Sequence, residues 1–355
     1  MAWTVSARTA RRIATTAAYG GGGVGLAGAG FYGLLRLEAT LARRAIGQPP
    51  ADPPVADGRF GHYYGEPISV VVLGDSSAAG VGVQTPQETP GAMLAAGLAA
   101  IAERPVQLTV VARIGAQTSH LAGQIREAAH ARADLAVVMV GANDVTHRVR
   151  PTISVRLLDE AVRQLRSAGA AVVVGTCPDL GTVEPIPHPL RWIARRASRR
   201  LAAAQTVVAV EAGARTVSVG SILGPEFAAA PSQMFSPDGF HPSSAGYAAA
   251  AAAMLPAAAS ALHLSRAEDE RPEPARGDEV LPVSLAAAEA VEESGTEVVA
   301  TQVAGHDRGS RGRWALLRHR RGRPLPAPER ASAENMAENM TENMADDMTS
   351  SRSRS

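Results

Sequence analysis

The sequence predicts an α/β fold in which a parallel β-sheet is buried between two layers of helices. Short runs rich in valine recur along the middle of the chain, and segments long enough for helices separate them. Uninterrupted apolar strands that alternate with helices are typical of a parallel sheet covered on both faces. Ligands bind such sheets beyond the carboxyl ends of the strands, so the residues that follow each run are the candidates for function.

The apolar runs predict five strands, and the segments around them predict five helices. The expected strands are 68–73, 106–114, 134–140, 170–176 and a weaker 215–221. The expected helices are 90–103, 119–131, 153–168, 189–213 and 243–262. Strands and helices therefore alternate within one folded domain, which we place at residues 66–264.

Length, net charge and cysteine content limit the kinds of protein that the chain can be. The chain has 355 residues, which exceeds the usual domain of about 100 to 200 residues and leaves room for appendages. The net charge of +1 gives no overall basic field, so we expect no nucleic-acid partner. Cys177 is the single cysteine, which excludes an intrachain disulfide. The chain contains no lysine, and its 35 basic residues other than histidine are all arginine, which is typical of GC-rich, bacterial coding.

The N-terminal region 1–44 contains an uncharged segment, 13–35, with arginines on both sides. A helix of this length spans a hydrocarbon core of about 30 Å, although its glycines lower both hydrophobicity and helix propensity. We interpret the region as a membrane anchor or signal-like segment, with a cleaved signal peptide and a soluble glycine-rich arm as alternatives. The expected location is the membrane or the secreted and envelope fraction, with the cytoplasm as runner-up. Flanking arginines are nearly balanced and leave the orientation open.

Two further regions flank the expected domain. Residues 45–65 are rich in proline, glycine and aspartate, which is typical of a linker. Residues 265–355 combine acidic and basic blocks with a four-residue repeat and few aromatic side chains. This composition predicts a disordered, low-complexity tail.

The expected helix around 188–205 carries arginines on adjoining turns together with Trp192. A solvated helix surface is one interpretation of this pattern. Contact with anionic lipid or with an acidic substrate is the other.

Small polar motifs occur where the expected strands end. Each contains glycine, and together they supply a serine, an asparagine, an aspartate and a histidine. In chain order they are Gly74-Asp75-Ser76, Gly115, Gly141 with Asn143, and Asp238 with His241. Each motif alone is typical of a turn or an exposed loop. Their joint occurrence, in phase with the strands, indicates a site at one edge of the sheet.

These residue types match the requirements of acyl transfer. A serine hydroxyl becomes a good nucleophile when a base takes its proton, and imidazole suits that task at neutral pH. A carboxylate on the other ring nitrogen fixes the tautomer of the imidazole. Backbone N–H groups and an asparagine amide can stabilise the oxyanion that develops. The sequence offers each of these groups near a strand end.

With these motifs, residues 66–262 resemble the SGNH hydrolases, also called GDSL-type esterases and lipases. The resemblance implies a flavodoxin-like three-layer sandwich with a five-stranded parallel sheet. It also implies that Ser76 is the nucleophile, His241 the base and Asp238 its orienting acid. The implied oxyanion hole consists of Ser76 N–H, Gly115 N–H and Asn143. Ser77 stands where the family name has leucine, so Ser77 must be excluded experimentally as the nucleophile.

The implied function is that of a serine carboxylic ester hydrolase that uses neither a cofactor nor a metal. Its expected substrate is a small-molecule or lipid acyl ester, and the segment 13–35 is the expected contact with a membrane. An acyltransferase to a sugar or lipid acceptor and an inactive membrane-tethered scaffold are the alternatives. Oligomeric state, acyl chain and alcohol group stay open.

Overall fold

The computed structural model describes residues 52–264, a helical segment at 32–42 with residues 44 and 46, and short strands between 281 and 319. Most of the predicted anchor 13–35, its residues 13–31, lies outside this part of the chain. Within the described residues, no helix is both long and apolar enough to cross a membrane. The predicted tail 265–355 is likewise mostly outside, apart from five short strands. These are β7 (Leu281–Pro282), β8 (Thr296–Val299), β9 (Thr301–Val303), β10 (His306–Arg308) and β11 (Leu316–His319).

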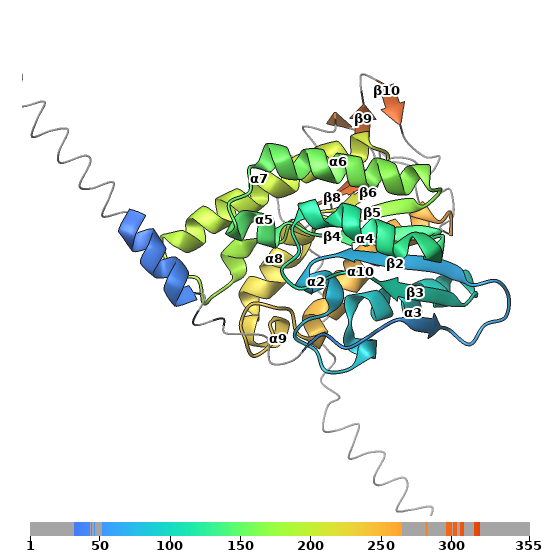
Figure 1. Cartoon of the computed structure of the whole chain (residues 1–355), viewed down its shortest axis with the longest axis horizontal. Helices are drawn as coiled ribbons and strands as arrows, with labels where there is room; N and C mark the ends of the chain where they lie inside the picture. The colour runs from blue at the N-terminus through green and yellow to red at the C-terminus, as the bar shows by residue number, and fades with distance from the viewer. Residues whose placement is uncertain are drawn as a thin grey trace, which may run out of the picture. The chain divides into compact units, whose positions relative to one another are not determined.

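A six-stranded sheet lies at the centre of the folded domain, with the strand order β1-β3-β2-β4-β5-β6 (Figure 1). Strands β2 to β6 run parallel, and each corresponds to one of the five predicted strands. The strands are β1 (Gly58–Phe60), β2 (Ile68–Gly74), β3 (Val106–Val110), β4 (Leu135–Met139), β5 (Ala171–Gly175) and β6 (Arg215–Val217). The predicted parallel sheet is therefore confirmed.

Strand β1 differs from the sequence-based expectation, because it lies inside the range 45–65 that we interpreted as a linker. It pairs antiparallel with β3, and Phe60 lies opposite Val106. Ala56, just before it, is buried in the core. A strand of three residues that begins with glycine is too short to show an alternating pattern. The folded domain consequently begins before residue 66.

Helices cover both faces of the sheet. Helices α3, α8 and α10 pack on one face, and α4, α6 and α7 pack on the other. The helices are α2 (Ser76–Ala79), α3 (Pro90–Ala102), α4 (Leu121–Glu127), α5 (Ala142–Thr146), α6 (Pro151–Ser167), α7 (Leu190–Glu211), α8 (Val219–Ala229), α9 (Pro231–Met234) and α10 (Ser244–Ala261). The result is the three-layer sandwich that the sequence predicts.

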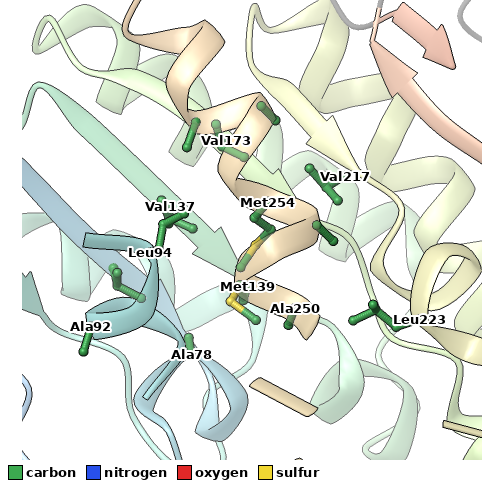
Figure 2. Close-up of a cluster of buried hydrophobic side chains, with 14 of the residues drawn as sticks. Ala78, Ala92, Leu94, Val137, Met139, Val173, Val217, Leu223, Ala250 and Met254 are labelled. Carbon is green, nitrogen blue, oxygen red and sulfur yellow. The ribbon is translucent and has the colours of Figure 1, made fainter. Parts of the chain in front are cut away.

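The two cores alternate along each strand, as a period of two requires. In β2, Val70 and Val72 belong to the core under α3 and α10, whereas Val71 and Leu73 belong to the core under α4 and α6. Figure 2 shows the first core, where Met254 packs among strand side chains. Full burial of each such side chain contributes about 1.5–3 kcal/mol, so the sheet is held from both sides.

Helix α8 was not predicted. The weak strand expected at 215–221 ends at Val217, and α8 begins at Val219. Valine and serine continue across the junction without a turn signal, and Pro225 lies inside the helix. Proline and glycine disfavour helix interiors, so local propensity concealed this element.

Candidate active site

Ser76 stands at the carboxyl edge of the sheet because β2 ends in a glycine that must approach β4 closely. Gly74 has a φ of 138°, and a Cβ there would lie 1.8 Å from the carbonyl oxygen of Met139. Asp75 then caps α2, since its Oδ1 accepts a hydrogen bond of 2.9 Å from Ser77 N–H. Ser76 is the first residue of α2, so its N–H has no intrahelical partner.

Gln124 fixes this junction from the adjacent helix α4. Its Nε2 donates to the Gly74 carbonyl at 2.8 Å, and its Oε1 accepts from Gly74 N–H at 2.8 Å. The side-chain amide thereby satisfies both backbone groups of the last residue of β2. Gln124 is buried. The sequence analysis missed this residue, and its one available signal was a polar amide at a buried helix position.

The structure brings together the serine, histidine and aspartate that the sequence analysis singled out. His241 Nε2 lies 3.1 Å from Ser76 Oγ, and His241 Nδ1 lies 2.6 Å from Asp238 Oδ2. All three side chains are largely buried. The three groups form one continuous line of hydrogen bonds, although Ser76 and His241 are 165 residues apart.

A tight loop holds Asp238 in place. Its Oδ1 accepts hydrogen bonds from Ser236 Oγ at 2.8 Å, Phe240 N–H at 2.8 Å and His241 N–H at 2.9 Å. Burial raises the pKa of Asp238, but these bonds and the one from His241 outweigh it and bring the pKa to about 2. The carboxylate is therefore ionised at neutral pH and is available as an acceptor for His241.

The remaining predicted residues lie on the neighbouring loops. Asn143, on α5, donates from Nδ2 to the carbonyl of Ala116 at 3.1 Å and also lines the pocket beside Ser76. Gly115 precedes Ala116 in the exposed loop after β3, with a φ of 75°, and is not among the described residues that line the pocket. The loop of Gly115 is thus tied to Asn143, while Gly115 itself stays outside the pocket wall.

Asp144 is a second buried residue that the sequence analysis did not single out as functional. Its Oδ2 accepts from Thr118 N–H at 3.1 Å, and its Oδ1 accepts from Ser154 Oγ at 2.7 Å. It joins α5 to the loop after β3 and to α6. Through these contacts Asp144 holds Asn143 and the Gly115 loop in one arrangement.

Gln205, from α7, performs a similar task between β4 and β5. Its Oε1 accepts from Cys177 N–H at 2.7 Å, and its Nε2 donates to the Val140 carbonyl at 3.0 Å. These backbone groups follow the ends of the two strands. The side chain thereby fixes the spacing of the loops that begin there.

A largely apolar pocket opens from Ser76 and Asn143 across the ends of β4 and β5 toward α8. Aliphatic and aromatic side chains dominate its wall. They are Met139, Val140, Leu180, Val183, Val219, Leu223, Phe227, Phe235, Phe240, Pro242 and Tyr247. Apolar clefts with a few converging polar groups are typical of small-molecule sites. The pocket can therefore hold an apolar group next to the Ser76 hydroxyl.

Comparison with known proteins agrees with this architecture. A sequence profile of the GDSL-like lipase/acylhydrolase family matches residues 72–249. The chain is also 38% identical over 260 residues to the GDSL-like esterase Rv1075c of Mycobacterium tuberculosis, across 70% of this chain and 80% of that protein. The family match and this relative show that the chain is a carboxylic ester hydrolase. Within that class, it belongs to the GDSL-like lipase/acylhydrolase family, the SGNH hydrolases.

Similarity to solved structures is weaker. LAE5, an α/β hydrolase from the metagenome of Lake Arreo in Spain, is 21% identical with a TM-score of 0.44, over 56% of this chain and 98% of that one. Axe2, an acetylxylan esterase from Geobacillus stearothermophilus, is 18% identical with a TM-score of 0.42, over 53% of this chain and 93% of that one.

Asp75 gives the site a pH-dependent stability. Burial raises the pKa of Asp75 to about 6, and repulsion from the Asp144 carboxylate raises it as well. The hydrogen bond from Ser77 N–H and the attraction of His241 lower this pKa, but they do not outweigh burial. The folded protein holds the proton more tightly than the unfolded chain, so stability falls as the pH rises from 3.8 to about 6. Ionisation of Asp75 over this range lowers the free energy of unfolding by about 3 kcal/mol.

We expect Asp75→Asn to remove this dependence, because asparagine keeps an acceptor for Ser77 N–H without ionising. The free energy of unfolding of the variant, minus that of the wild type, should rise by about 3 kcal/mol between about pH 4 and pH 7. Urea unfolding across this range measures the difference. A difference that is constant, or that falls with pH, would contradict the buried, proton-binding carboxylate.

Proposed function

We propose that this esterase cleaves acyl esters through a covalent acyl-serine intermediate, with Ser76, His241 and Asp238 as its catalytic triad. The observation that carries the proposal is the line of hydrogen bonds at 3.1 Å and 2.6 Å that joins the three side chains. An imidazole placed between a hydroxyl and an ionised carboxylate is the arrangement that activates a serine.

In the first half of the reaction, Ser76 Oγ attacks the ester carbonyl carbon while His241 Nε2 takes the hydroxyl proton. Asp238 accepts the hydrogen bond from Nδ1–H and stabilises the imidazolium that forms. Its ionised state at neutral pH, which follows from its pKa of about 2, supports this role. His241 then gives its proton to the alcohol oxygen as the carbon–oxygen bond breaks, so the alcohol leaves and the acyl group stays on Ser76.

Water completes the cycle in the second half. The water oxygen attacks the acyl carbon while His241 Nε2 takes a proton from the water. His241 then gives that proton to Ser76 Oγ as the acyl-serine bond breaks. The products are the carboxylic acid and the free hydroxyl. The protons balance without a further reactant.

The proposed oxyanion donors are Ser76 N–H and the Asn143 amide, together with Gly115 N–H, which the family resemblance implies and which belongs to the loop tied to Asn143 just outside the pocket wall. The unpartnered position of Ser76 N–H at the start of α2 supports the first donor. The Asn143 amide carries two N–H groups, and its bond to the Ala116 carbonyl orients it beside the pocket. Loss of one such donor commonly lowers kcat about 10²–10³-fold.

Ser76→Ala tests the nucleophile, and Ser77→Ala is the matched control because Ser77 also lines the pocket. We expect Ser76→Ala to lower kcat for p-nitrophenyl butyrate by about 10⁴-fold or more, since no other hydroxyl contacts His241 Nε2 among the described residues. Ser77→Ala should change kcat less than about tenfold.

Initial rates measure both effects, and circular dichroism shows whether each variant is folded. Retained turnover in folded Ser76→Ala, or its loss in Ser77→Ala, would overturn the assignment of the nucleophile.

The apolar pocket indicates the substrate. We propose that it holds an acyl chain longer than acetyl, because the wall beyond Ser76 is built from side chains such as Leu223 and Phe227. On the α8 side, Gly224 lines the pocket, and a Cβ there would meet no atom within 4 Å. The space into which a side chain at 224 would project is therefore open.

Gly224→Leu should fill part of this space and shorten the acyl chain that fits. The ratio of kcat/KM for p-nitrophenyl octanoate to that for the acetate is expected to fall about tenfold or more. Gly123→Leu is the matched control, because Gly123 is also a helical glycine, and a Cβ there would meet only Arg126, at 3.8 Å. An unchanged ratio in an active Gly224→Leu variant would show that the acyl chain lies elsewhere.

A further inference from the structure

The N-terminal helix, residues 32–42, is docked through a face that contains Glu38, Ala42 and the half-buried Leu35, and it exposes its other three leucines. Glu38 is 5% exposed, and its Oε2 accepts a hydrogen bond of 2.9 Å from the N–H of Leu190, the first residue of α7. Ala42, one turn later, is buried in the core. Leucines 34, 37 and 41 are 43%, 56% and 48% exposed. The inward face thus includes one leucine, whereas three of the four leucines of this helix stay about half exposed.

The exposed leucines form one row. Leu34, Leu37 and Leu41 are three and four residues apart, which places them on one face of the helix. That face borders the docked face that contains Glu38 and Ala42. Because each leucine is about half exposed, covering it would add about half of the 1.5–3 kcal/mol that full burial of such a side chain gives. The row therefore favours a partner that covers it.

Helix α7 extends this surface. Trp192 is 59% exposed and lies two residues after Leu190, which receives the cap from Glu38. The guanidinium of Arg196 stacks over its ring at 5.9 Å from the centroid. Figure 1 shows the N-terminal helix, in blue, beside α7. Trp192 thus adds a large exposed apolar side chain on α7, the helix whose first turn Glu38 caps.

The charged groups on these two elements are mainly basic. Arg36 lies on the N-terminal helix, its side chain above the ring of Tyr32, and Arg195 and Arg196 are exposed on α7. Arg195 forms an ion pair with Asp179 at 3.4 Å. The buried carboxylate of Glu38 accepts the hydrogen bond from Leu190 N–H, so it adds no exposed negative charge to these elements. Leucine, tryptophan and arginine side chains on one surface are typical of contact with hydrocarbon below and anionic headgroups above.

We propose that Leu34, Leu37, Leu41 and Trp192, with Arg196, form a lipid-binding face that lies on a bilayer containing anionic lipid. The chain enters this face directly from the uncharged segment 13–31, whose composition suits the same environment. The bilayer contact is independent of the proposed triad. It gives the esterase a surface that binds lipid without catalysing.

Trp192 can report on this contact in the full-length chain. The chain has three tryptophans, so Trp3→Phe combined with Trp314→Phe leaves Trp192 as the single emitter. With vesicles of phosphatidylcholine and phosphatidylglycerol, we expect emission to shift to shorter wavelengths and to be quenched by lipids brominated on the acyl chain. Pure phosphatidylcholine vesicles should give clearly weaker quenching, because they lack the anionic headgroup.

In the same background, Leu37→Gln with Leu41→Gln should weaken vesicle partitioning about tenfold or more. Ile101→Gln, at a comparably exposed residue of α3, is the matched control and should leave partitioning unchanged. Turnover of p-nitrophenyl acetate should stay constant in all these variants, which shows that they are folded.

Three results would overturn the lipid-binding face. The first is vesicle sedimentation without quenching of Trp192, which would place the contact elsewhere on the chain. The second is the lack of any stronger binding to anionic than to neutral vesicles, with quenching of Trp192 equal on both or absent on both. The third is a blue shift that grows with protein concentration in the absence of vesicles, which would identify a second copy of the chain as the partner.

Discussion

The close approach of β2 and β4 at Gly74 is the constraint on which the site depends. A Cβ at this position would overlap the carbonyl oxygen of Met139, so the two strands can be neighbours here only because the side chain is absent. Gln124 then satisfies both backbone groups of Gly74 from α4. With the end of β2 fixed in this way, Asp75 caps α2 and the Ser76 hydroxyl meets His241. Residues that never contact a substrate therefore determine where the hydroxyl lies.

Much of this arrangement could be predicted from sequence because it follows from local patterns. Valine-rich runs predicted the five parallel strands, and the polar residues after them, together with Asp238 and His241 before the last helix, predicted the serine, histidine and aspartate that meet at one edge. Gln124, Gln205 and Asp144 could not be predicted, because each bonds backbone or side-chain groups that are distant in sequence. Helix α8 was concealed by residues with poor helix propensity. Tertiary packing decided these features, and one sequence carries no direct record of it.

The site divides into a polar edge and an apolar interior. The proposed chemistry needs only the edge, where Ser76, His241 and Asp238 are linked. In our proposals, the pocket toward α8 selects the acyl chain of the substrate, and the leucine row with Trp192 binds a lipid surface. Together the proposals describe an esterase that acts on an ester with an apolar acyl chain and works close to a bilayer. Each part depends on different residues and can fail separately.

Covalent labelling tests the central claim, that Ser76 is an activated nucleophile, most directly. A fluorophosphonate forms a stable bond to a serine oxygen that a neighbouring base has activated. Intact-mass analysis and peptide mapping of the labelled full-length chain should show one adduct, on Ser76, and His241→Ala should suppress its formation. An adduct on Ser77, labelling that persists without His241, or no adduct at all would contradict the account.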